Sequence, residues 1–150
     1  MNKKFFKSIK LCTLLLAIIF TIFSILMVFS SFVVLLIQIG ALNNIEGFNQ
    51  AEMNQLMQSV SFFDSFLIYY QTVLYLILTI FMYIFYSKLK NGELVSKVPY
   101  FIIIFDEVYG IIFSFFNPTT FFFILTFFSI IIILVALVPI INLFKLEPSV

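Results

Sequence analysis

The longest apolar run in the chain, residues 11–37, constrains the fold most strongly because it contains no charged residue. Its 27 residues exceed the roughly 20 that an α-helix needs to cross the hydrocarbon core of a bilayer. A cleavable secretory signal also begins with basic residues, but its apolar core is only roughly 7–15 residues long. We therefore expect a retained first transmembrane helix over residues 11–38.

Three further apolar stretches, at residues 65–87, 98–117 and 119–144, are long enough to span a membrane. The first two are joined by a short loop at 88–97, in which Asn91-Gly92 is a turn signal. The composition agrees, since 63% of residues are hydrophobic and 10% are charged, whereas a soluble domain is about one quarter charged. The sequence predicts a single all-α integral membrane domain of four transmembrane helices in an antiparallel bundle.

The one long polar segment, the loop at 39–64, carries the pattern of a short helix. Its Asn49 and Glu52 have the spacing of a capping box. The apolar residues that follow repeat at helical intervals, which is typical of an amphipathic helix that lies in the membrane interface. An adaptable, methionine-rich docking surface for a partner is the alternative interpretation. The apolar stripe consists of Met53, Leu56, Met57 and Val60.

The lysines predict the orientation of the chain. All eight precede the first span, lie in the loop at 88–97 or follow the last span. Lysines concentrate on the cytoplasmic side of membrane proteins, so we expect both termini to be cytoplasmic. Heavy use of Phe, Ile and Lys without Arg or Trp is typical of an AT-rich bacterial genome, and we therefore expect a location in the bacterial plasma membrane.

Asp106 and Glu107 interrupt the third apolar stretch and form the candidate site. A carboxylate at membrane depth costs several kcal/mol unless it is neutral, paired or hydrated. Four arrangements would relieve that cost: neutral acids bonded to hydroxyls, a bound cation, a wet cavity, or a cation supplied by another protein. A shorter third span would instead leave both acids close to the inner interface, with no special role.

Hydroxyl groups on the second span supply possible neighbours for these acids. They recur every three or four residues and therefore lie on one helical face. Because a short turn joins the second and third spans, we expect the two helices to pack antiparallel, with this face toward Asp106. The predicted supporting polar face consists of Thr72, Tyr75, Thr79 and Tyr83, with Tyr109 of the third span.

Small residues at helical spacing predict where helices approach each other closely. One such face lies on the first span and a second lies beside the acid pair. Serine and threonine are also tolerated in lipid when they bond to the preceding turn of their own helix, which is the alternative interpretation. The predicted packing residues are Thr13, Ala17, Thr21 and Ser24, together with Gly110 and Ser114.

The residue types present disfavour most enzyme classes. The chain has no histidine and one cysteine, so the usual zinc, haem and thiol-pair chemistries lack their residues. Intramembrane aspartyl proteases need two aspartates on facing helices, whereas Asp106 is the one aspartate inside a predicted span. We expect no enzymatic activity and no metal or cofactor. A net charge of +1 gives no basic surface for nucleic acid.

Two functions fit the remaining features. The first is a non-catalytic accessory, regulatory or immunity-type partner of another integral membrane protein, or of a second copy of the chain, with Asp106 and Glu107 as the contact. The second is a proton- or cation-coupled small transporter or channel subunit that uses the same acids. In its four spans and intramembrane acid the outline resembles the small multidrug exporters, whose single glutamate lies in the first span. The first span here has no acid, so no residue role is carried over.

Overall fold

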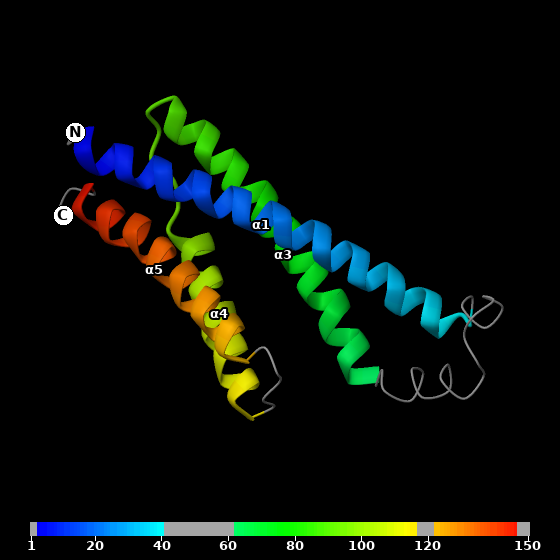
Figure 1. Cartoon of the computed structure of the whole chain (residues 1–150). Helices are drawn as coiled ribbons and strands as arrows, with labels where there is room; N and C mark the ends of the chain where they lie inside the picture. The colour runs from blue at the N-terminus through cyan, green and yellow to red at the C-terminus, as the bar shows by residue number, and fades with distance from the viewer. Residues whose placement is uncertain (1–2, 41–61, 117–121, 147–150) are drawn as a thin grey trace. The chain divides into compact units, whose positions relative to one another are not determined.

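The computed structural model describes residues 3–40, 62–116 and 122–146. The regular structure in these ranges consists of four α-helices and no strand (Figure 1): α1 (Lys3–Gln38), α3 (Phe62–Lys90), α4 (Val98–Phe116) and α5 (Phe122–Leu146). Each helix is long and apolar enough to cross a membrane. The prediction of an all-helical, multi-pass membrane protein is confirmed at this level. The amphipathic helix predicted at 53–60 lies outside the described residues.

Three of the helices extend beyond the predicted spans to include lysines, and one of them is α5, which ends at Leu146 rather than at residue 144. Helix α1 begins at Lys3 rather than at residue 11, and α3 continues to Lys90 rather than ending at residue 87. The predicted limits were set by charge, because lysine does not enter the hydrocarbon core. Lysine is nevertheless a good helix former, so the helix continues where the span ends.

The ends of α3 and α4 follow from local sequence. Gly92 has a φ of 84°, and its N–H bonds the Leu89 carbonyl, while the Glu93 N–H bonds the Lys88 carbonyl. This pair of bonds is the Schellman motif, which uses glycine because other residues resist a positive φ. The predicted turn is therefore confirmed. Helix α4 begins where the Ser96 hydroxyl accepts a hydrogen bond from the N–H of the second residue along.

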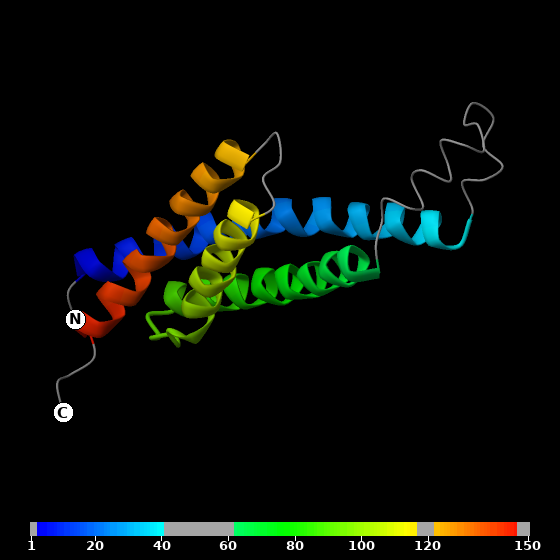
Figure 2. The same ribbon diagram turned by 90° about the horizontal axis from the view of Figure 1, so that it is seen from below.

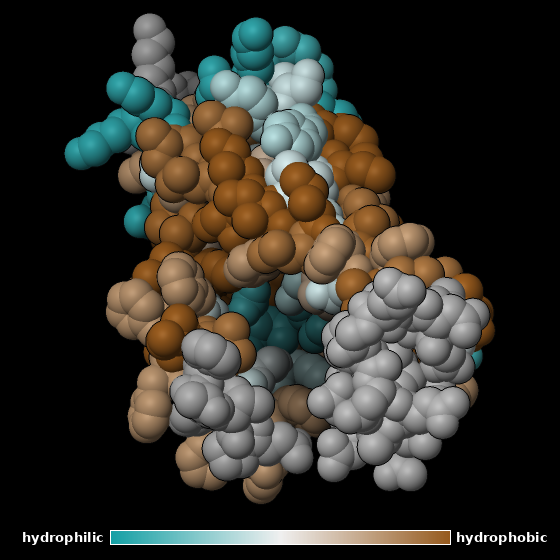
Figure 3. All heavy atoms as spheres, turned by 45° about the vertical axis from the view of Figure 1, so that its right-hand side comes forward, coloured by the Kyte–Doolittle hydropathy of each residue, from teal (hydrophilic) through white to brown (hydrophobic). Residues whose placement is uncertain are grey.

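The chain divides into two compact units, which are described separately. The larger unit comprises Met1–Ile19 and Leu78–Val150, and the smaller unit comprises Phe20–Ile77. In the larger unit α4 packs against α5 (Figures 1 and 2). Apolar side chains cover most of the described surface that Figure 3 shows, as a lipid-facing surface requires.

The core of the larger unit gathers around Tyr100 of α4, which is fully buried. Its ring lies 6.2 Å from that of Phe85 on α3, and its hydroxyl lies 2.7 Å from the hydroxyl of Thr13 on α1. Three helices therefore meet at one side chain. The aliphatic part of this core includes Ile9, Leu16, Leu78, Met82, Leu89, Ile103, Ile132, Ile140 and Leu143.

In the smaller unit polar contacts join the second part of α1 to the first part of α3. The Ser31 hydroxyl lies 2.6 Å from that of Thr72. The Gln38 side chain donates to the Ser65 hydroxyl at 2.9 Å and accepts from the Tyr69 hydroxyl at 3.1 Å. Such contacts join membrane helices because lipid offers polar groups no hydrogen bond.

Candidate functional site

The inward face of α4 brings Glu107 into the larger unit. Tyr100, Ile103 and Glu107 follow each other at helical spacing, and all three are buried. Only 6% of the Glu107 surface remains exposed. Glu107 therefore lies on the same face of α4 as the core residues Tyr100 and Ile103.

The groups around the Glu107 carboxyl come from α5. The side chain of Ser129 is its hydrogen-bond partner. The Oε1 atom of Glu107 is buried without a hydrogen-bond partner, and so is the Oγ1 atom of Thr126. Thr126 precedes Ser129 by three residues, which places the two hydroxyls one turn apart along α5. The Glu107 carboxyl thus has one hydroxyl partner on the contacting helix, and Thr126 carries a second hydroxyl one turn earlier along α5.

Asp106 has a different environment from its neighbour. One residue of helix rotates a side chain by about 100°, so the two acids leave α4 in different directions. Asp106 is partly exposed while Glu107 is buried, and the two acids interact electrostatically. The structure therefore separates the predicted acid pair into an enclosed member and an outward member.

The predicted hydroxyl face of α3 makes its described contacts with α1. In the smaller unit Thr72 bonds Ser31 and the Met27 carbonyl, and the Tyr75 ring lies 5.4 Å from that of Phe20. Further along, Thr79 is partly buried and Tyr83 is 45% exposed. The pairing of this face with Asp106 stays a prediction.

Beside the acids on α4, Tyr109 is 45% exposed and stacks on Phe113 with ring centroids 6.2 Å apart. Gly110 does not mark a close helix approach among the described residues, because a Cβ added there would meet no atom within 4 Å. The flanking Ser114 is partly exposed. Close approach was predicted from residue size alone, and size permits such an approach without requiring it.

The small residues of α1 lie mostly inward. Thr13 and Ala17 are fully buried in the larger unit, and Ser24 is 5% exposed in the smaller unit. Thr21 is partly buried. The Thr13 hydroxyl donates to the Ile9 carbonyl at 2.8 Å and also contacts the Tyr100 hydroxyl. This side chain therefore both bonds within its own helix and packs against another helix.

Sequence reasoning missed the polar residues of the last span. Thr126 and Ser129 stand three residues apart in an otherwise apolar run, a spacing that places them on one helical face. Asn142, near the end of the same helix, is only 9% exposed. These were signals of the same kind as the hydroxyl stripe of α3 and would have identified α5 as a neighbour of an acid.

The polar groups of the site are all oxygen groups, namely a carboxyl and hydroxyls. In the described ranges no group of three His, Cys, Asp or Glu residues could hold a metal ion. A carboxyl group with nearby hydroxyl groups can bind a proton, a water molecule or a small cation, because oxygen atoms bind each of these. Comparison of the chain with protein families, curated proteins and solved structures gives no match.

Proposed function

We propose that this protein is a non-catalytic partner of another integral membrane protein in the bacterial plasma membrane, with Asp106 as its contact and both termini in the cytoplasm. The role is accessory, regulatory or of the immunity type. In this proposal the four spans form an antiparallel bundle, and the segment 53–60 lies as an amphipathic helix in the outer interface.

The partial exposure of Asp106 carries this proposal. The residue lies within a helix of membrane-spanning length, and other residues of the chain leave part of its surface uncovered. Lipid gives a carboxyl group no hydrogen bond, so polar side chains within spanning helices almost always face protein or water. The exposed part of Asp106 therefore offers a polar contact to a second membrane protein.

Affinity purification from native membranes in a mild detergent tests this proposal. We expect Asp106→Asn to lose a specific membrane partner that the wild-type chain retains. Glu93→Gln is the matched control, since it makes the same charge change in the exposed loop at 88–97 and should leave the partner bound. The proposal fails if wild-type protein purifies alone, or if both variants keep the same partner.

A second function, proton- or cation-coupled transport, is favoured by a separate observation. The Oε1 atom of Glu107 is buried and has no hydrogen-bond partner, which is costly because buried polar atoms in folded proteins are usually hydrogen-bonded. A site that binds and releases a proton or a small cation would retain such an atom. Ser129 and Thr126 would then orient the carboxyl group or contribute further oxygens.

Flux into liposomes tests the transport function. We expect Glu107→Gln to abolish ion-driven or pH-driven flux while the protein still folds, because glutamine keeps the shape and loses the exchangeable charge. Glu93→Gln again serves as the control. Wild-type flux no greater than that of empty liposomes, or unchanged flux in the Glu107 variant, excludes this function.

A further inference from the structure

We propose that the lysine-rich end of the larger unit binds the phosphate of an anionic phospholipid in a site between the start of α1 and the end of α3. This inference concerns a surface remote in sequence from Asp106 and does not rest on either proposed function. It depends on the charge at this end, the contacts that hold the two helices together there, and the residues that share their facing sides.

The charge at this end is mainly positive. The lysines of the larger unit lie at the start of α1, at or after the end of α3, and at the end of α5. Glu93 is the one acid between α3 and α4. The exposed lysines of this end are Lys4, Lys7, Lys88, Lys90 and Lys145.

Contacts between lysines and aromatic rings tie these helix ends together. The Lys10 ammonium lies 5.6 Å from the centre of the Tyr86 ring and so joins α1 to α3. The Lys145 ammonium lies 5.4 Å from the ring of Phe5 and joins α5 to α1. A cation held over a ring still has N–H groups that point away from the ring and can bond an anion. The lysine-rich end is therefore a connected surface.

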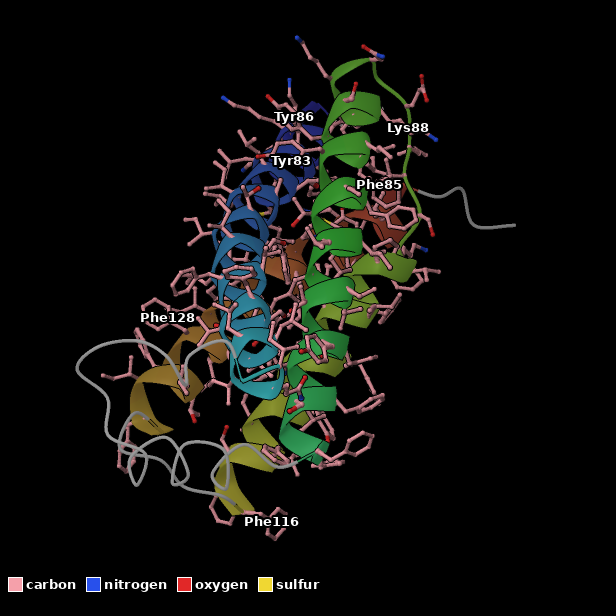
Figure 4. The ribbon with its side chains drawn as sticks, turned by 90° about the vertical axis from the view of Figure 1, so that its right-hand side faces the viewer. Tyr83, Phe85, Tyr86, Lys88, Phe116 and Phe128 are labelled. Atoms are coloured by element: carbon pink, nitrogen blue, oxygen red, sulfur yellow. The ribbon has the colours of Figure 1, made fainter. Side chains whose placement is uncertain are left out.

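Two stripes meet at the Lys10–Tyr86 contact. On α1, Lys7 and Lys10 are three residues apart, and on α3 Tyr83, Tyr86 and Lys90 follow at three and four, so each set shares one helical face. Figure 4 shows Tyr83 and Tyr86 on one side of α3, with Phe85 and Lys88 on the other. Ammonium and phenol groups therefore converge on one side, and both types donate hydrogen bonds to phosphate.

Apolar surface below this cluster suits an acyl chain rather than free phosphate. Leu11 lies one turn after Lys7 and is 56% exposed, and Ile80 lies one turn before Tyr83 and is 59% exposed. A phospholipid whose phosphate sits among the lysines would lay its chains along these side chains. The cytoplasmic leaflet, to which the lysines are assigned by the positive-inside rule, is also the leaflet rich in anionic lipid.

Titration of the full-length protein in detergent micelles with phosphatidylglycerol, followed by native mass spectrometry, tests this proposal. We expect Lys7→Gln with Lys90→Gln to weaken binding by about tenfold or more, since each lysine near an anionic membrane surface contributes roughly fivefold in affinity. Lys88→Gln with Lys145→Gln is the matched control, because it removes two charges from the same lysine-rich end, and neither residue belongs to the two stripes that meet at the Lys10–Tyr86 contact. The control should bind within about twofold of wild type.

A second variant covers the case in which the lysine pair disturbs folding. Tyr83→Phe with Tyr86→Phe keeps the rings and removes two hydroxyl donors, and we expect about threefold or greater weakening. Equal weakening by the two lysine pairs would overturn the proposal, since binding would then follow net charge alone. Equal binding of phosphatidylcholine, or full competition by inorganic phosphate, would also overturn it.

Discussion

The two units treat their polar side chains differently. In the smaller unit Thr72 is bonded to the Ser31 hydroxyl and to the carbonyls of Met27 and Ile68, and Gln38 is bonded on both sides of its amide. In the larger unit the Thr13 and Tyr100 hydroxyls also join two helices, but Glu107 and Thr126 each bury an oxygen with no partner. The contrast is between polar groups that hydrogen-bond to a neighbouring helix and buried oxygen atoms that have no hydrogen-bond partner.

This contrast separates a packing role from a site. A hydrogen bond between membrane helices contributes about 0.6 kcal/mol on average, which is enough to choose among helix arrangements. A buried oxygen without a partner costs about 1–3 kcal/mol, so its retention needs another reason. Glu107 is therefore the residue at which stability and function should move in opposite directions.

The largest effect is expected from Glu107→Leu. Leucine fills a similar volume and removes the unpartnered Oε1, so the free energy of unfolding should rise by about 1–3 kcal/mol while flux is lost. Reversible unfolding in mixed micelles measures the first quantity. Glu93→Leu, in the exposed loop, should change stability by less than about 0.5 kcal/mol. A loss of stability in the Glu107 variant would mean that the carboxyl is satisfied, and the contrast between the units would disappear.

The next effect is expected from Tyr100→Phe, within the core of the larger unit. The change removes the 2.7 Å contact with Thr13, and we expect a loss of about 1–1.5 kcal/mol in unfolding free energy. The Thr13 hydroxyl keeps its bond to the Ile9 carbonyl, which limits the loss. Tyr109→Phe, at a residue 45% exposed, should cost less than about 0.5 kcal/mol. Equal losses in the two variants would contradict the importance of burial at Tyr100.

The presence of four long apolar helices in the described residues could be predicted from the sequence because it depends on charge and length alone. Lysines and the Asn91-Gly92 turn mark where the apolar chain stops, because moving a charge into hydrocarbon is costly. The prediction placed the membrane segment of the third span at 98–117, and α4 occupies Val98–Phe116.

The rotation of each helix could not be predicted in the same way. In α5 nearly every side chain is apolar, so hydrophobicity gives no preferred inward face. Most of these side chains are as stable in lipid as in contact with protein. A rotation of about 100° decides between Asp106 and Glu107 as the buried acid. The rotation of α4 depends on how side chains of α1 and α5 pack against it. The contacts of Tyr100 with Thr13 and of Glu107 with Ser129 both require this rotation, and neither contact can be read from one helix alone.

A smaller effect is expected from Thr72→Val in the smaller unit. Valine keeps the shape and removes the bonds to Ser31 and to two carbonyls, so we expect a loss of about 0.6 kcal/mol and at most about 1.7. Unfolding in micelles measures it. Ser31→Ala should have a similar effect, and the double variant should cost less than the sum because both remove one contact. Exact additivity would mean that the Ser31–Thr72 contact contributes nothing.

The smallest effect is expected from Gln38→Leu at the end of α1. Its amide bonds Ser65 and Tyr69, but the residue is exposed, so water or headgroups replace both bonds when the amide is removed. We therefore expect a loss below about 0.5 kcal/mol. The Thr72 and Gln38 variants together test whether the polar contacts of the smaller unit stabilise it in proportion to their burial. A cost for Gln38→Leu above that of Thr72→Val would reverse this order and show that the contact at the helix end, rather than the buried hydroxyl pair, holds α1 and α3 together in this unit.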